Sequence, residues 1–319
     1  MGADHFVAPN PSFGAVFTYY LRDGIKSKKT LRQESEKPLR ASTSDIPFPG
    51  WEALDAERTE DIARIWLTIT DSNGNTVRRI GCPAESGFHR VAWDLKHPFP
   101  DPVRLNDPTA EANFNQSGVL AAPGTYTASL SKQVNGVITQ LSKPVTFVVE
   151  PLRKGTLQGN SPEETAAFWK SYENASQSFS AIQIAATNSL ARITAMQKAL
   201  RMANAAPGPL DQQVFQVRQE LIELNGKLSG NGAKAQIGEK NNPTIGERLF
   251  KVLLSITSST YGPTATNLRS LEIINQELAN IHIALEAEIT KINTLSKELL
   301  NAGAPWIESE ALPPLQKNN

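Results

Sequence analysis

The spacing of hydrophobic residues along the chain changes near residue 150. Between Arg64 and Thr70, the apolar residues Ile65, Leu67 and Ile69 alternate with other side chains. This period of two is typical of a β-strand with one buried face. Beyond residue 161, apolar residues recur every three or four positions, as on one face of an α-helix. The pattern therefore predicts a β-rich N-terminal part followed by a helical C-terminal part.

The N-terminal part contains several short strands separated by turns. Asn73-Gly74 and Asn135-Gly136 supply the dipeptide that favours a tight hairpin turn. Further strands are expected at 15–21, 76–80, 91–95, 124–132 and 141–151. Short strands at such intervals predict an antiparallel β-sandwich. In it Trp93 is expected in the core, whereas Trp66 lies out of phase with Ile65 and faces away from it.

Two long segments interrupt these strands and are predicted to be loops, at 22–60 and 96–120. The first is rich in lysine and arginine in its first half and in serine, proline and acidic residues afterwards. It is interpreted as a solvated loop, with a polyanion-binding patch as the alternative. Trp51, in this loop, is expected to anchor it onto the sheet. The second loop contains four prolines up to Pro108.

The C-terminal part shows helix signals at both ends of each periodic segment. Ser161, Pro162 and Glu164 form a helix start, with serine as the N-cap and glutamate three residues later. Helices are predicted at 161–203, 210–228, 243–260 and 267–302, with a loop at 229–242. Because the second and third helices together roughly equal the first or the fourth, we expect an elongated antiparallel bundle of three columns, the middle one broken. A four-helix bundle of uneven lengths is the alternative.

The composition narrows the possible partners. The chain has 32 basic and 32 acidic residues, so no net field favours nucleic acid. Its one cysteine, Cys82, cannot form an internal disulfide. No run approaches the roughly 18 apolar residues of a membrane span, and no signal peptide is visible. Neither nucleic acid binding nor a membrane span is expected.

Candidate catalytic and metal-binding residues are few. The four histidines lack metal-ligand spacing: His5, His89, His97 and His282. Asp71, Asn73 and Asn75 resemble the first half of a calcium loop, but Thr76 and Cys82 occupy the positions that require glycine and glutamate. A plain hairpin turn is therefore the preferred interpretation, and no metal or cofactor is expected.

Glycosidases use two carboxylates that face each other across a cleft. Asp94, Asp101 and Asp107 could be arranged in this way, but acids are common at strand ends and in loops. The exposed ring of a tryptophan can stack on a sugar, so Trp51 and Trp66 are possible docking or glycan-contact residues. No catalytic residues are predicted, and enzymatic activity is the least favoured hypothesis.

Three motifs carry a family resemblance. They are I-x-D-x-x-G-x-x-V-R from Ile69 to Arg78, G-x-H-x-x-x-W-D from Gly87 to Asp94, and A-P-G-T-Y from Ala122 to Tyr126. They resemble the Ig-like domain of flagellar hook-capping proteins. Together with APNPSFGAVFTYYL (Ala8 to Leu21), their order is similar to the C-terminal region of bacterial sortilin-like proteins with BNR or glycosidase-type propeller repeats. In that family a β-propeller precedes an Ig-like domain and a helical tail, and the present chain lacks the propeller.

The resemblance implies an α+β multidomain protein that is exported to the periplasm or the cell exterior. The expected organisation is an Ig-like β-sandwich at 1–151, a linker at 152–160, an elongated antiparallel helical bundle at 161–305 and a loose tail at 306–319. The expected function is that of a non-catalytic structural or protein-interaction module, whose partner is another protein or a propeller of the same protein. A carbohydrate-binding accessory region of a glycosidase-like protein is the alternative.

Overall fold

A computed structural model describes residues 10–42, 45–98, 102–103, 117–152, 158–204, 208–239, 242–259, 261–308 and 310–313. The chain is α+β, with antiparallel sheets and, within these residues, seven helices. It divides into two compact units. The first comprises 1–99 and 112–154, and the second comprises 100–111 and 155–319. The division at 154/155 falls inside the predicted linker.

The larger sheet of the first unit has five antiparallel strands. They are β2 (Arg64–Thr70), β3 (Thr76–Cys82), β7 (Gly124–Val134), β8 (Val137–Gln140) and β9 (Val145–Val149). The order is β3-β2-β7, and β8 and β9 pair in turn with the two halves of the other edge of β7. Both predicted hairpins are present, and Asn135 and Gly136 have the positive φ angles that a tight turn requires.

A second layer covers the apolar face of this sheet. It is the ribbon of β1 (Ala15–Leu21) and β4 (Gly87–Trp93), which pair antiparallel. The core between the layers contains Ile65, Leu67, Ile69 and the fully buried Trp93. The prediction that Trp93 lies in the core is thus confirmed.

The segment 22–60, predicted to be a loop, contains two helices. They are α1 (Lys28–Ala41) and α2 (Trp51–Arg58). The Ser27 side chain caps the start of α1. Arg32 joins the helices through an ion pair of 2.6 Å to Glu57 of α2, and it also pairs with Glu36 within α1, at 2.7 Å. Polar side chains therefore hold the two helices together. For this reason the sequence of 22–60 shows no apolar periodicity that would predict them.

The second predicted loop, 96–120, begins and ends in a short pair of strands. These are β5 (Lys96–Pro98) and β6 (Ser117–Leu120), which pair antiparallel. Ala121, directly after β6, donates a backbone hydrogen bond of 2.6 Å to the carbonyl of Leu95. Most of the interior of this loop lies outside the described residues.

The helices of the second unit begin and end within a few residues of the predicted positions. They are α3 (Pro162–Leu200), α4 (Pro209–Ser229), α6 (Ile245–Thr257) and α7 (Ala265–Asn301). Ser161 and Glu164 form the predicted capping box at the start of α3. The predicted loop at 229–242 contains one additional short helix, α5 (Gly232–Gln236).

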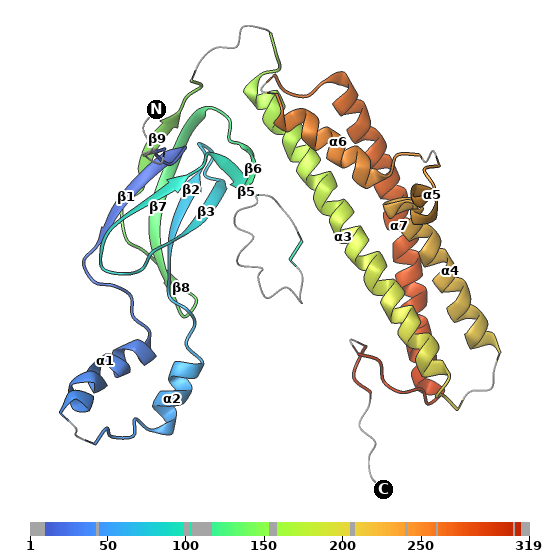
Figure 1. Cartoon of the computed structure of the whole chain (residues 1–319), viewed down its shortest axis with the longest axis horizontal. Coiled ribbons are helices and arrows are strands. Elements are labelled where there is room, and N and C mark those ends of the chain that lie inside the picture. Colours follow the sequence, from blue (N-terminus) through green and yellow to red (C-terminus); the bar gives the residue numbers. More distant parts are fainter. Residues whose placement is uncertain are drawn as a thin grey trace, which may run out of the picture. The chain divides into compact units, whose positions relative to one another are not determined.

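The helices pack as three columns, with α4 and α6 sharing the middle one (Figure 1). Helices α3 and α7 contact each other, and both contact α4 and α6. Asn160 before α3 bonds to Tyr261 before α7, and Asn204 after α3 bonds to Ala302 after α7. The two long helices therefore run in the same direction. This arrangement agrees with the three-column prediction.

The tail after Trp306 was predicted to be loose, but its described part is attached to the bundle. The carboxylate of Glu310 accepts hydrogen bonds from Arg192 on α3, at 2.8 Å, and from Ser296 on α7, at 2.8 Å. The prediction was wrong here because one acidic side chain, which no apolar pattern marks, provides the attachment. Residues 314–319 lie outside the described part.

Glu310→Ala is expected to release this tail, since the ion pair and the hydrogen bond to Ser296 are both lost. Limited chymotrypsin digestion should then cleave after Trp306 several times faster than in the unaltered chain, because the residues around this bond are no longer held against the bundle. Glu308→Ala, which removes an exposed carboxylate from the same tail, is the control. Equal cleavage of both variants would show that Glu310 does not hold the tail.

Candidate functional site

Trp66 lies on the face of the larger sheet opposite the core, as its alternation with Ile65 predicted, but its ring is covered. It is only 9% exposed. The guanidinium of Arg79 lies 4.5 Å from the ring centroid, and the indole nitrogen donates a 2.7 Å hydrogen bond to Gln133. A sugar or a partner could reach the ring face only if Arg79 moved away.

Trp51 is in the opposite situation. It is 75% exposed at the first turn of α2, so the expectation that it anchors the segment onto the sheet was wrong. Its ring packs edge-to-face against Phe48, with centroids 5.1 Å apart, and Phe48 is itself exposed. We call these two residues the hairpin aromatic pair. Pro47 and Pro49 flank Phe48 and stiffen the backbone around it.

A second exposed aromatic pair lies on the outer face of the β1–β4 ribbon. Tyr20 and Phe88 are cross-strand neighbours whose ring centroids are 4.8 Å apart, and both are largely exposed. Val16 is exposed on the same face of β1. We call Tyr20 and Phe88 the ribbon aromatic pair. Alternation in β1 could have placed Tyr20 outward, but only the pairing register brings Phe88 beside it.

The residues considered for calcium form a hairpin turn. The Asp71 carboxylate accepts hydrogen bonds from the backbone of Asn73, at 2.9 Å, and of Asn75, at 2.8 Å. The side chain of Asn75 adds a further bond of 3.1 Å, and this bond together with the backbone donors lowers the pKa of Asp71. The carboxylate therefore stabilises the turn.

The remaining candidates are spread over the chain. Asp94 accepts a bond from the backbone of Lys96, while Asp101 and Asp107 lie outside the described residues, as does His5. Burial raises the pKa of the Cys82 thiol to about 11, which keeps it protonated and unreactive at neutral pH.

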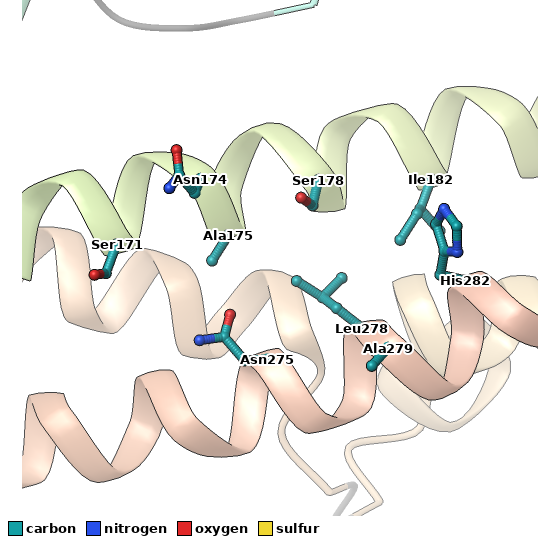
Figure 2. Close-up of a pocket in the computed structure, with 9 residues that line it drawn as sticks. All are labelled: Ser171, Asn174, Ala175, Ser178, Ile182, Asn275, Leu278, Ala279 and His282. Atoms are coloured by element: carbon teal, nitrogen blue, oxygen red, sulfur yellow. The ribbon is translucent and has the colours of Figure 1, made fainter.

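An open groove of about 380 Å³ runs between α3 and α7 (Figure 2). Ile182 and Leu278 are buried at its base, and small or polar side chains such as Ser178 line its walls. His282 lies at one end, and its Nδ1 is 3.7 Å from Glu286 on the same helix. The polar groups of this groove are distributed along two helices and do not converge on one point.

The described residues of the bundle include two buried carboxylates, Glu173 on α3 and Glu288 on α7, and the second lies in a charged cluster. Glu288 on α7 is 6% exposed, and Lys291 lies 2.7 Å from its Oε1 and 2.7 Å from Oε2 of Glu220 on α4. Burial raises the pKa of Glu288, whereas the hydrogen bond from Lys291 lowers that of Glu220. The second oxygen of Glu288 has no hydrogen-bond partner within the described residues. This cluster connects α4 to α7.

Comparisons with protein-family models, curated proteins and solved structures find no match. Within the part of the chain that the structure describes, no helix combines the length and apolar character needed to cross a membrane.

Proposed function

We propose that the chain is a non-catalytic protein-interaction module of a larger exported propeller protein. The first unit would act as an immunoglobulin-like domain that contacts the propeller, or another protein, through its exposed aromatic pairs. The single observation that supports this proposal best is the hairpin aromatic pair, in which Trp51 and Phe48 pack on each other and yet remain largely exposed.

Exposed aromatic residues are informative because they are unfavourable in water and favourable at interfaces. Tryptophan and tyrosine are enriched among the residues that contribute most to protein–protein binding. Two adjacent rings fix each other's orientation, which reduces the conformational entropy lost on binding. The ribbon aromatic pair has the same properties, so the first unit offers two candidate anchor points.

Trp51→Ala is expected to weaken binding to a partner propeller at least tenfold, because a central aromatic anchor typically contributes about 2 kcal/mol or more. The measurement is isothermal titration of the whole chain with the isolated β-propeller of a bacterial sortilin-like protein. Circular dichroism should show an unchanged fold, since the Trp51 side chain is exposed.

Phe215→Ala is the matched control, because Phe215 is an exposed aromatic residue of α4 in the second unit. It should leave the affinity unchanged. Equal effects of the two substitutions, or no binding to the propeller by the unaltered chain, would contradict the proposal.

Carbohydrate binding is the alternative, and the exposure of the Trp51 ring is the observation that favours it. A ring that is open on its face can stack on a sugar. Retention of the chain on a glycan array that is lost in Trp51→Ala, with no binding to the propeller, would support this alternative over the first proposal.

A further inference from the structure

The middle column of the bundle is interrupted, and the interruption leaves a notch against α7. Helix α4 ends at Ser229, and Gly230 follows with a φ of 79°, which turns the chain out of the helix. The column resumes only at Ile245, and α5 lies between (Figure 1). Helix α7 continues past this break, so the part of its surface that a continuous middle helix would cover is left open.

The notch has a volume of about 520 Å³. This lies within the range of roughly 300–1,000 Å³ typical of small-molecule sites. Leu224 of α4, Ile245 of α6 and Ile281 of α7 line it and are all buried. Three helices thus provide an apolar base that can accept the apolar part of a ligand.

The charged side chains that line the notch are two lysines and one glutamate. Lys227 and Lys234 both line the notch, and Glu277 is the one carboxylate among the lining residues. Asn231 uses its side-chain oxygen to cap α5, through bonds of 3.0 and 3.3 Å, so its remaining amide group can only donate. Lys227 has one ion pair, 3.5 Å from Glu223, in which both side chains are exposed and which is correspondingly weak.

The start of α6, beside the notch, already has a carboxylate. Thr244 and Glu247 form a capping box there, in which the amides of these two residues bond to each other's side chains. The side-chain donors available to a negative charge in the notch are those of the lysine and asparagine residues.

We propose that this notch binds a small molecule with an apolar body and one anionic head group, such as a carboxylate or a sulfonate. The body lies over Ile281 and Leu224, and the head group is held by Lys227 and Lys234. The inference is independent of the interaction proposed for the first unit, because every lining residue belongs to the second.

The test uses 8-anilinonaphthalene-1-sulfonate as the anionic probe and 1-anilinonaphthalene as its neutral counterpart. Fluorescence titration of the whole chain should show one saturable site for the anion. The double substitution Lys227→Ala and Lys234→Ala should weaken anion binding about tenfold, equivalent to about 1.4 kcal/mol, and leave binding of the neutral probe unchanged.

Asn280→Trp fills the notch from its exposed rim and should abolish binding of both probes. Lys297→Ala, which removes an exposed lysine elsewhere on α7, should have no effect. Circular dichroism at 222 nm verifies that each variant keeps its helices. Binding that survives Asn280→Trp, an equal loss in Lys297→Ala, or the absence of a saturable site would overturn the proposal.

Discussion

Replacing Trp93 by alanine is expected to destabilise the first unit by about 3–5 kcal/mol. The Trp93 side chain is fully buried between the two layers, and its ring contacts those of Tyr126, at a centroid distance of 5.3 Å, and Phe147, at 6.1 Å. Its indole nitrogen also donates a hydrogen bond of 3.0 Å to the carbonyl of Lys96. The substitution therefore leaves a cavity and an unpaired acceptor at once.

Hydrogen–deuterium exchange measures this effect separately in each unit. A loss of about 3 kcal/mol corresponds to more than a hundredfold loss of protection for amide protons of β2 and β7. Protection in α3 and α7 should not change. Trp51→Ala is the control, because it removes the same side chain from an exposed position. Similar protection in the two variants would show that Trp93 is not the centre of this core.

Lys291→Met is expected to destabilise the second unit by about 2 kcal/mol at pH 8. The substitution keeps the apolar part of the side chain but removes the cation between Glu220 and Glu288. Breaking a fully buried pair costs about 3–5 kcal/mol, and we expect less here because Lys291 itself is partly exposed.

The pH dependence of this effect has a defined sign. Burial holds the pKa of Glu288 above its ordinary value of 4.5, so the folded state binds the proton more tightly than the unfolded state. The stability contributed by protonated Glu288 is thus fully present below about pH 4.5 and is lost as the pH rises through the raised pKa. Removing Lys291 raises this pKa further, so acidification should relieve the destabilisation.

Urea denaturation followed by circular dichroism at 222 nm, at pH 5 and pH 8, measures both effects. Lys297→Met, at an exposed site on the same helix, is the control. The double variant Lys291→Met with Glu288→Gln should recover most of the stability at pH 8, because no buried charge remains. A loss that is the same at both pH values would argue against a buried carboxylate as its cause.

The elements that the sequence predicts well are those whose own apolar spacing determines them. The alternation through Ile65 and Ile69 placed β2 correctly, and the three- and four-residue steps placed α3 and α7 within a few residues. In each of these elements, the residues of the buried face all lie within one continuous segment of the chain. Local signals such as Asn135-Gly136 and the Ser161 capping box then defined the turns and ends.

Helices α1 and α2 were missed because their stability depends on pairs between separate segments. Arg32 reaches Glu57 in the other helix, a contact that spacing within either segment cannot reveal. Pro38 lies inside α1, where proline normally argues against a helix. The main difference between the predicted and the observed fold is thus explained by polar contacts between residues that are distant in the sequence.

The candidate site could be predicted only in part for the same reason. The alternation of residues in β2 predicted the face of the sheet on which Trp66 lies. It could not predict that Arg79 on β3 and Gln133 on β7 contact the Trp66 ring. The exposure of Trp51 and the pairing of Tyr20 with Phe88 depend on tertiary structure and strand register. The notch beside α7 arises from a gap between helices, which the pattern located near 229–242 without showing what lines it.

The position of β9 at the edge of the larger sheet bears on how the protein behaves at high concentration. Its strand pairs with β7 on one side, and Val145 and Val148 are exposed. An exposed apolar edge strand can recruit strands from other molecules and so initiate aggregation, a tendency that the short length of β9 reduces. Pro144 and Pro151 flank it and lack the amide hydrogen that such pairing requires. The two prolines therefore limit the segment that can pair with a strand of another molecule to a few residues, which favours colloidal stability.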